Sequence, residues 1–178
     1  GLPRFCGGAV GYLSYEVAGR FEKLPAPEKD SLALPEAVFM LTDSFLVFDH
    51  VSHRIKVISL MSIDGDLEQA YAAATARIDE LCRRLNAPLK LKTSTKFKRT
   101  ANSTFTSSVT RESFEANVAS IKEDITAGEA IQVVLSQRLS RATRADPFDI
   151  YRALRSINPS PYMYYMNLGS FQIIGASP

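Results

Sequence analysis

The sequence is poor in the residues that most catalytic and metal sites need. It has two cysteines, two histidines and no tryptophan in 178 residues. Cys6 and Cys82 lie far apart without metal-like spacing, as expected of structural thiols in a reducing, cytoplasmic protein. His50 and His53 form an HxxH pair, but no cysteine or suitably spaced glutamate accompanies them. We therefore expect turn residues there rather than a zinc site.

Other classes of function are excluded by what the chain lacks. No apolar run approaches the roughly 18 residues that span a bilayer, and no signal peptide is recognisable. The formal net charge of +2 indicates no nucleic-acid partner. The glycine-rich stretch "FCGGAVGYLSYEVAG" has neither GxGxxG nor a P-loop lysine, so it predicts a packed strand. Neither a Ser-His-Asp arrangement nor a general-base pair is evident.

What the sequence does contain is a mixture of strand and helix patterns, which predicts an α+β fold with helices packed on largely antiparallel strands. The segment "AVFMLTDSFLVFDHVSHRIKVISLMS" predicts two or three strands with a turn at "DHVSHR". Apolar periodicity predicts three helices, over residues 66–85, 111–127 and 147–157. Asp64 or Asp66, Thr110 and Asp146 are their expected N-caps, and Gly128 is a C-terminal signal of the second. The segments "YMYYMNL" and "FQIIGAS" predict two final strands.

The chain divides into three parts on composition. Residues 1–95 form the first, a polar and basic stretch over 96–109 reads as a linker, and residues 110–178 form the last. A start without methionine and an end directly after a strand suggest a piece of a longer polypeptide. We expect this piece to oligomerise or to have low stability, because apolar surface and sheet edges would be exposed.

Two places combine unusual residues. Gln132 heads the apolar run "IQVVLSQ", which predicts a buried strand, and a buried amide must find hydrogen-bond partners or lose roughly 1–3 kcal/mol. The segment "NPSPYMYY" crowds two prolines and three tyrosines after a helix. From the pattern alone this segment is either an edge strand entered through a stiff turn or a wrapping surface for a flat apolar ligand.

Three segments together carry a family resemblance: "GLPRFCGGAVGYLSYE", "AGEAIQVVLSQR" and "PFDIYRALRSINPSPYMYYMNLGSFQIIGASP". They resemble the large subunit, or component I, of anthranilate synthases in the chorismate-utilising family. The resemblance implies the family's large α/β sandwich of two sheets, of which residues 1–95 supply part of the N-terminal region and residues 110–178 the first portion of the catalytic region. The implied activity is conversion of chorismate and ammonia into anthranilate and pyruvate, with a glutamine amidotransferase subunit (component II) as the ammonia-supplying partner.

The resemblance also implies roles for particular residues. Relatives that add water carry a lysine where Gln132 stands, so glutamine here implies a contact to substrate or nucleophile without hydroxide formation. Gly175 and Ser177 approach the active site in the family. The resemblance implies a tryptophan feedback site that includes a five-residue set, namely Asn158, Pro159, Pro161, Tyr162 and Met163.

The cofactor implied is Mg²⁺, whose glutamate ligands are expected downstream, with no metal site in this chain. Because a catalytic glutamate, histidine and these ligands follow "GASP" in the family, the 178 residues alone are expected to be inactive. Two alternatives remain open. One is aminodeoxychorismate synthase component I, which aminates elsewhere on the ring, and the other is a non-catalytic tryptophan-sensing or scaffold domain.

Overall fold

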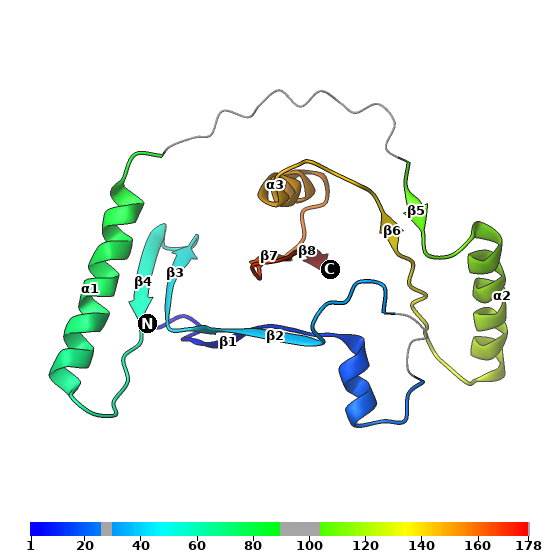
Figure 1. Ribbon diagram of the computed structural model, residues 1–178, viewed down its shortest axis with the longest axis horizontal. Helices are drawn as coiled ribbons and strands as arrows, with labels where there is room; N and C mark the ends of the chain where they lie inside the picture. The colour runs from blue at the N-terminus through cyan, green and yellow to red at the C-terminus, as the bar shows by residue number, and fades with distance from the viewer. Residues whose placement is uncertain (26–29, 90–103, 178) are drawn as a thin grey trace. The chain divides into compact units, whose positions relative to one another are not determined.

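The computed structural model describes residues 1–25, 30–89 and 104–177 (Figure 1). The chain forms two compact units. Unit 1 comprises Gly1–Leu91 with Tyr164–Ile174, and unit 2 comprises Lys92–Met163 with Gly175–Pro178. Helices and antiparallel strand pairs alternate along the chain, so the predicted α+β class is confirmed.

Unit 1 contains two antiparallel ribbons and a long helix. Strands β1 (Gly8–Leu13) and β2 (Ala37–Thr42) form the first ribbon, in which Gly11 lies opposite Phe39. Strands β3 (Ser44–Asp49) and β4 (Arg54–Ser59) form the second, joined by the predicted turn around His50 and His53. Helix α1 (Leu67–Asn86) lies alongside β4 (Figure 1), and Cys82 is half-buried on it.

The glycine-rich strand is shorter than the sequence suggested. It ends at Leu13, and residues Tyr15–Arg20 form the 3-10 helix η1 instead. The ladder stops because its partner strand starts at Ala37, and the Ser14 N–H donates to the Glu36 carbonyl at 2.7 Å. Beyond that point no strand partner remains for residues 15–20 within the described chain, so their backbone turns onto itself.

Unit 2 contains helices α2 (Arg111–Ala127) and α3 (Pro147–Ile157) and the short strand pair β5 (Thr106–Ser107) with β6 (Leu139–Ser140). Strands β7 (Tyr162–Asn167) and β8 (Gln172–Ser177) pair with each other. The start of β7, up to Met163, and the end of β8, from Gly175, fall in unit 2, and the rest of both strands falls in unit 1. Strand β5 lies inside the predicted linker 96–109, whose residues 96–103 lie outside the described part. The three-part division by residue number stays a prediction.

Local capping explains why the helices begin where the sequence predicts. The Asp66 carboxylate accepts hydrogen bonds from the backbone N–H groups of Glu68 and Gln69, and Thr110 Oγ1 accepts one from Ser113. Asp146 accepts from the Phe148 N–H at 2.8 Å, with Pro147 in the first turn. Each cap satisfies backbone donors that the first turn of a helix leaves free. Gly128 ends α2 at a φ of 86°, which glycine adopts without a Cβ penalty.

The β3–β4 turn depends on one carboxylate. Asp49 Oδ1 accepts from the N–H groups of Ser52 (3.0 Å) and Val51 (3.1 Å), and Oδ2 lies 3.3 Å from Lys56 Nζ. These contacts hold the pKa of the Asp49 carboxyl well below its usual range, first through the Ser52 backbone N–H, then the Ser52 hydroxyl and Lys56.

We expect the turn to weaken in acid. Because the folded pKa of Asp49 is lowered, its stabilising contribution is complete above the unfolded pKa of about 3.9 and is lost as pH falls through the folded pKa. Asp49→Asn keeps an acceptor for Val51 and Ser52 but removes the charge. Amide-exchange protection of β3 and β4 should therefore fall less between pH 5 and 2.5 in Asp49→Asn than in the parent chain. An equal fall in both would contradict this.

Apolar side chains remain accessible throughout the molecule. Among the described residues none is fully buried, and 33 large apolar side chains are exposed, which shows that these residues enclose no closed core of their own. No helix in the described part of the chain has both the length and the apolar composition needed to cross a membrane.

Candidate functional site

The candidate ligand segment, residues 158–163, follows helix α3 directly. The Asn158 N–H donates to the Leu154 carbonyl at 2.8 Å and closes the helix. Pro159 cannot continue it, because proline has no N–H and disfavours helical geometry in the residue before it. Asn158 accordingly adopts φ −134° and ψ 72°. The chain leaves the helix in an extended form and enters β7 at Tyr162.

Ser160 connects this segment to the end of β8. Its hydroxyl donates to the Ser177 carbonyl, and Ser160 Oγ accepts from the Tyr162 N–H at 3.3 Å. The contact brings the predicted tryptophan segment beside Ser177, a residue predicted on separate grounds to approach the active site. Sequence reasoning missed Ser160. Ser160 stands between Pro159 and Pro161, which have no backbone N–H, and two residues before the N–H of Tyr162. A serine at this spacing from a backbone donor is the signal that indicates a serine turn.

Exposure differs along the segment in a way that suits ligand contact. The Tyr162 side chain is 69% exposed, and Asn158, Pro159 and Pro161 are also exposed. Met163 and Gly175 are half-buried. An exposed aromatic ring held between stiff proline backbone and a hydrogen-bonded strand end is a surface on which a flat apolar ring can stack at low entropic cost. The hydrogen bond from Ser160 to Ser177 thus places the predicted segment beside the end of β8.

The prediction of a buried strand around Gln132 was wrong. Residues 131–136 belong to no helix or strand of the described chain, and Gln132 is exposed. A strand needs a neighbouring ladder, and only Leu139–Ser140 find one, opposite Thr106–Ser107. Within the described residues no hydrogen bond holds the Gln132 side chain, which is exposed.

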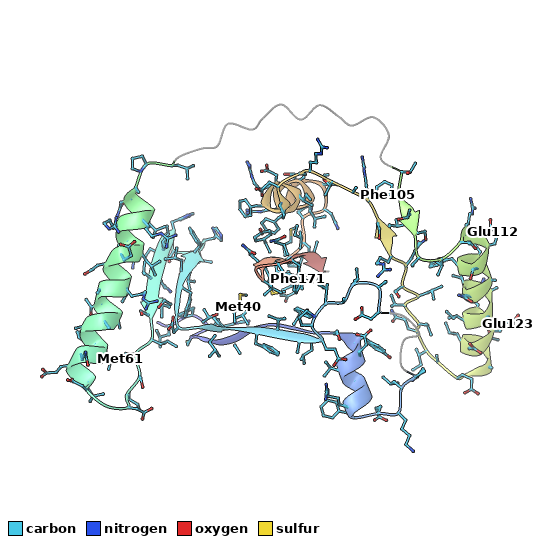
Figure 2. The ribbon with its side chains drawn as sticks, in the orientation of Figure 1. Met40, Met61, Phe105, Glu112, Glu123 and Phe171 are labelled. Atoms are coloured by element: carbon cyan, nitrogen blue, oxygen red, sulfur yellow. The ribbon has the colours of Figure 1, made fainter. Side chains whose placement is uncertain are left out.

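The far end of the Gln132 segment is nevertheless fixed. Gln137 Nε2 donates to Ser107 Oγ at 2.9 Å, and the Arg138 N–H donates to Ser108 Oγ at 3.1 Å. The Arg141 guanidinium stacks over Phe105, with its carbon 5.1 Å from the ring centroid; Phe105 is labelled in Figure 2. These contacts anchor residues 137–141 to β5 and leave residues 131–136 as the exposed arm that holds Gln132.

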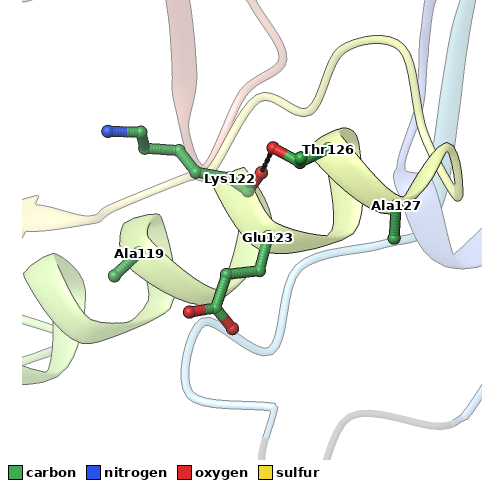
Figure 3. Close-up of a pocket in the computed structure, with 5 residues that line it drawn as sticks. All are labelled: Ala119, Lys122, Glu123, Thr126 and Ala127. Atoms are coloured by element: carbon green, nitrogen blue, oxygen red, sulfur yellow. Dashed lines mark hydrogen bonds between the residues drawn. The ribbon is translucent and has the colours of Figure 1, made fainter.

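A hollow of about 540 Å³ lies beside helix α2 (Figure 3). Its lining includes Ala119, Lys122, Glu123, Thr126 and Ala127, and the Thr126 hydroxyl donates to the Lys122 carbonyl at 2.8 Å. These five side chains come from one helix, so they do not converge on a ligand as side chains from several elements do. None of the residues predicted to bind substrate or effector is among them.

Metal sites in proteins are built from histidine, cysteine and acidic side chains that lie close together. In residues 1–25, 30–89 and 104–177, no three histidine, cysteine or acidic side chains gather to hold an ion. No residues of the described chain are therefore assigned to Mg²⁺.

Comparison with known proteins gives one consistent result. A family model described as chorismate binding enzyme matches residues 2–178. Anthranilate synthase component 1 of Acetivibrio thermocellus is 43% identical over 99% of this chain and 37% of its own length. That of Saccharomyces cerevisiae is 43% identical over 100% of this chain and 36% of its own length. The chain thus spans little more than a third of these relatives.

The fold agrees with the sequence comparison. The crystal structure of anthranilate synthase component I from Streptococcus pneumoniae TIGR4 matches 100% of this chain and 40% of that chain, with a TM-score of 0.79 at 31% identity.

Proposed function

Because the chain belongs to the chorismate-binding enzyme family, we propose that it forms part of an anthranilate synthase large subunit. The proposal rests on one observation, identity of 43% to proteins of that name over essentially the whole chain. The aminodeoxychorismate alternative is not favoured, since these relatives bear the anthranilate synthase name. A purely tryptophan-sensing or scaffold role gains no support from them either.

The reaction proposed for the complete enzyme is a lyase reaction. Ammonia, supplied by a glutamine amidotransferase subunit, attacks the ring carbon next to the one bearing the carboxylate, and the 4-hydroxyl leaves as water. Elimination of the enolpyruvyl group then releases pyruvate and gives the aromatic product anthranilate. Mg²⁺, if resident, would neutralise the substrate carboxylate through ligands outside this chain. We place the protein in the cytoplasm.

Gln132 has a selective role in this proposal. An amide neither gains nor loses a proton near neutral pH, so it cannot activate water, but it both donates and accepts hydrogen bonds. Its exposed position on the 131–136 arm supports a contact with substrate or ammonia. Gly175 and Ser177 lie on β8, where the Ser177 carbonyl accepts from Ser160. Because the chain spans little more than a third of its relatives, we propose that it is inactive alone.

The activity is tested in a chimera in which these 178 residues replace the matched segment of the Acetivibrio thermocellus protein. Given chorismate, Mg²⁺ and ammonium, the chimera should form anthranilate, detected by its fluorescence, whereas the 178-residue chain should form none. A chimera that folds but makes aminodeoxychorismate, or no product, would overturn the proposal.

Feedback inhibition is tested with Tyr162→Ala in the same chimera. Loss of the exposed ring should raise the tryptophan concentration needed for half-inhibition by about fivefold, because aromatic stacking contributes on the order of 1 kcal/mol beyond area burial. Tyr71→Ala is the matched control, since Tyr71 on α1 is similarly exposed at 67%. Equal tryptophan sensitivity of the two variants would contradict the assignment of residues 158–163.

A further inference from the structure

Ser160 differs in exposure from its neighbours in the candidate ligand segment. It is half-buried, whereas the residues around it are exposed, namely Asn158, Pro159, Pro161 and Tyr162. Successive residues of an extended chain point to opposite sides. The two prolines beside Ser160 therefore lie toward the side from which a ligand can approach, and the Ser160 hydroxyl lies toward the end of β8.

The Ser160 hydroxyl joins two backbone groups of unit 2. It donates to the Ser177 carbonyl and accepts from the Tyr162 N–H at 3.3 Å. A serine hydroxyl has a single proton to donate, and here Ser177 receives it. One oxygen atom thus connects the backbone that carries the Tyr162 ring with the last residue of β8.

The backbone is stiff at both ends of this connection. Pro159 and Pro161 each have a φ fixed near −65°. Ser160 and Ser177 each precede a proline in the sequence, which disfavours helical geometry and keeps a residue extended. Since neither end can rotate freely, a displacement of one end passes to the other through the hydrogen bond.

We propose that the Ser160 hydroxyl couples tryptophan binding at residues 158–163 to substrate binding at the end of β8. Ser160 is then a positioning residue. An indole stacked on the Tyr162 ring restrains the segment, and the bond to Ser177 carries that restraint to β8, so the state that binds tryptophan binds chorismate less well. The inference rests on the feedback site and on the role of β8 in the proposed function, and it adds the connection between them.

The test measures the coupling directly by calorimetric titration of tryptophan into the chimera. Titrations are made with and without chorismate, in the presence of Mg²⁺ and without ammonium, so that no anthranilate forms. Coupling between two ligands is reciprocal, and saturating chorismate should raise the Kd for tryptophan by about tenfold in the parent chimera. In Ser160→Ala the Kd without chorismate should stay within about twofold of the parent value, while the effect of chorismate falls to about twofold or less.

Two further variants separate coupling from a structural role. Ser160→Thr keeps a hydroxyl and should keep the full effect of chorismate. Ser156→Ala is the matched control, because it removes another hydroxyl of unit 2, one that donates to the Arg152 carbonyl of its own helix at 3.2 Å. It should also keep the full effect. If Ser160 only stabilised the segment, Ser160→Ala would weaken tryptophan binding equally with and without chorismate.

The contact itself is measured in the 178-residue chain by hydrogen exchange of the Tyr162 amide. Exchange should be about tenfold faster in Ser160→Ala and unchanged in Ser156→Ala, and an unchanged rate in Ser160→Ala would overturn the inference. An undiminished effect of chorismate in the Ser160→Ala chimera would also overturn it, while leaving the proposed function in place. A parent chimera that binds no tryptophan would instead reject the feedback site of the proposed function, and this coupling with it.

Discussion

Gln132→Lys in the chimera should lower anthranilate formation by about a hundredfold or more and yield a hydroxylated product in its place. A lysine amine next to substrate can take a proton from water, and a well-placed general base contributes roughly 10²–10⁴-fold. Water then competes with ammonia for the ring. Since Gln132 is exposed on an unpaired arm, the substitution buries no charge within these residues, and the loss is not one of folding.

Gln132→Leu separates the two effects of that substitution. It removes the amide without adding a base, so anthranilate should fall while no hydroxylated product appears. Product analysis by chromatography and mass spectrometry distinguishes the two variants. A lysine variant that keeps the parent rate of anthranilate formation would show that residue 132 does not choose the nucleophile.

Gly11→Val should break the β1–β2 ribbon. A Cβ at Gly11 would lie 1.8 Å from the Val38 carbonyl oxygen and 2.8 Å from Phe39 Cα. Backbone atoms cannot move aside as a flexible side chain can, so the two strands must separate, at a cost of about 3 kcal/mol. Hydrogen exchange of the β2 amides should become as fast as that of unpaired segments.

Gly19→Ala is the matched control for Gly11→Val. A Cβ at Gly19 meets nothing within 4 Å, and Gly19 is not among the glycines with positive φ. In Gly19→Ala the backbone amides of β2 should exchange at the same rate as in the parent chain. Protection of β2 that survives in Gly11→Val would mean that the strands approach each other less closely than the structure shows.

The helix boundaries that the sequence predicted correctly have local causes. Asp66, Thr110 and Asp146 cap helices through side chains two or three residues from their donors, and Gly128 ends α2 through its own φ. Such contacts are encoded within one turn of chain, so pattern and propensity suffice.

The errors have non-local causes. Residues 131–138 have the composition of a strand, but a strand forms only where another lies beside it, and within the described residues none does. Likewise, the strand at residues 8–13 stops where its partner 24 residues later begins. The same limit applies to the site, because the contact from Ser160 to Ser177 joins residues 17 apart and has no signature at either position alone.

The most direct test of the central claim, that this chain belongs to an enzyme that adds ammonia rather than water to chorismate, is an isotope competition. The chimera is given chorismate and ¹⁵N-ammonium in ¹⁸O-water, and the aromatic product is analysed by mass spectrometry. The product should be anthranilate that carries ¹⁵N and no ring-bound ¹⁸O. A hydroxylated product that carries ¹⁸O on the ring would contradict it.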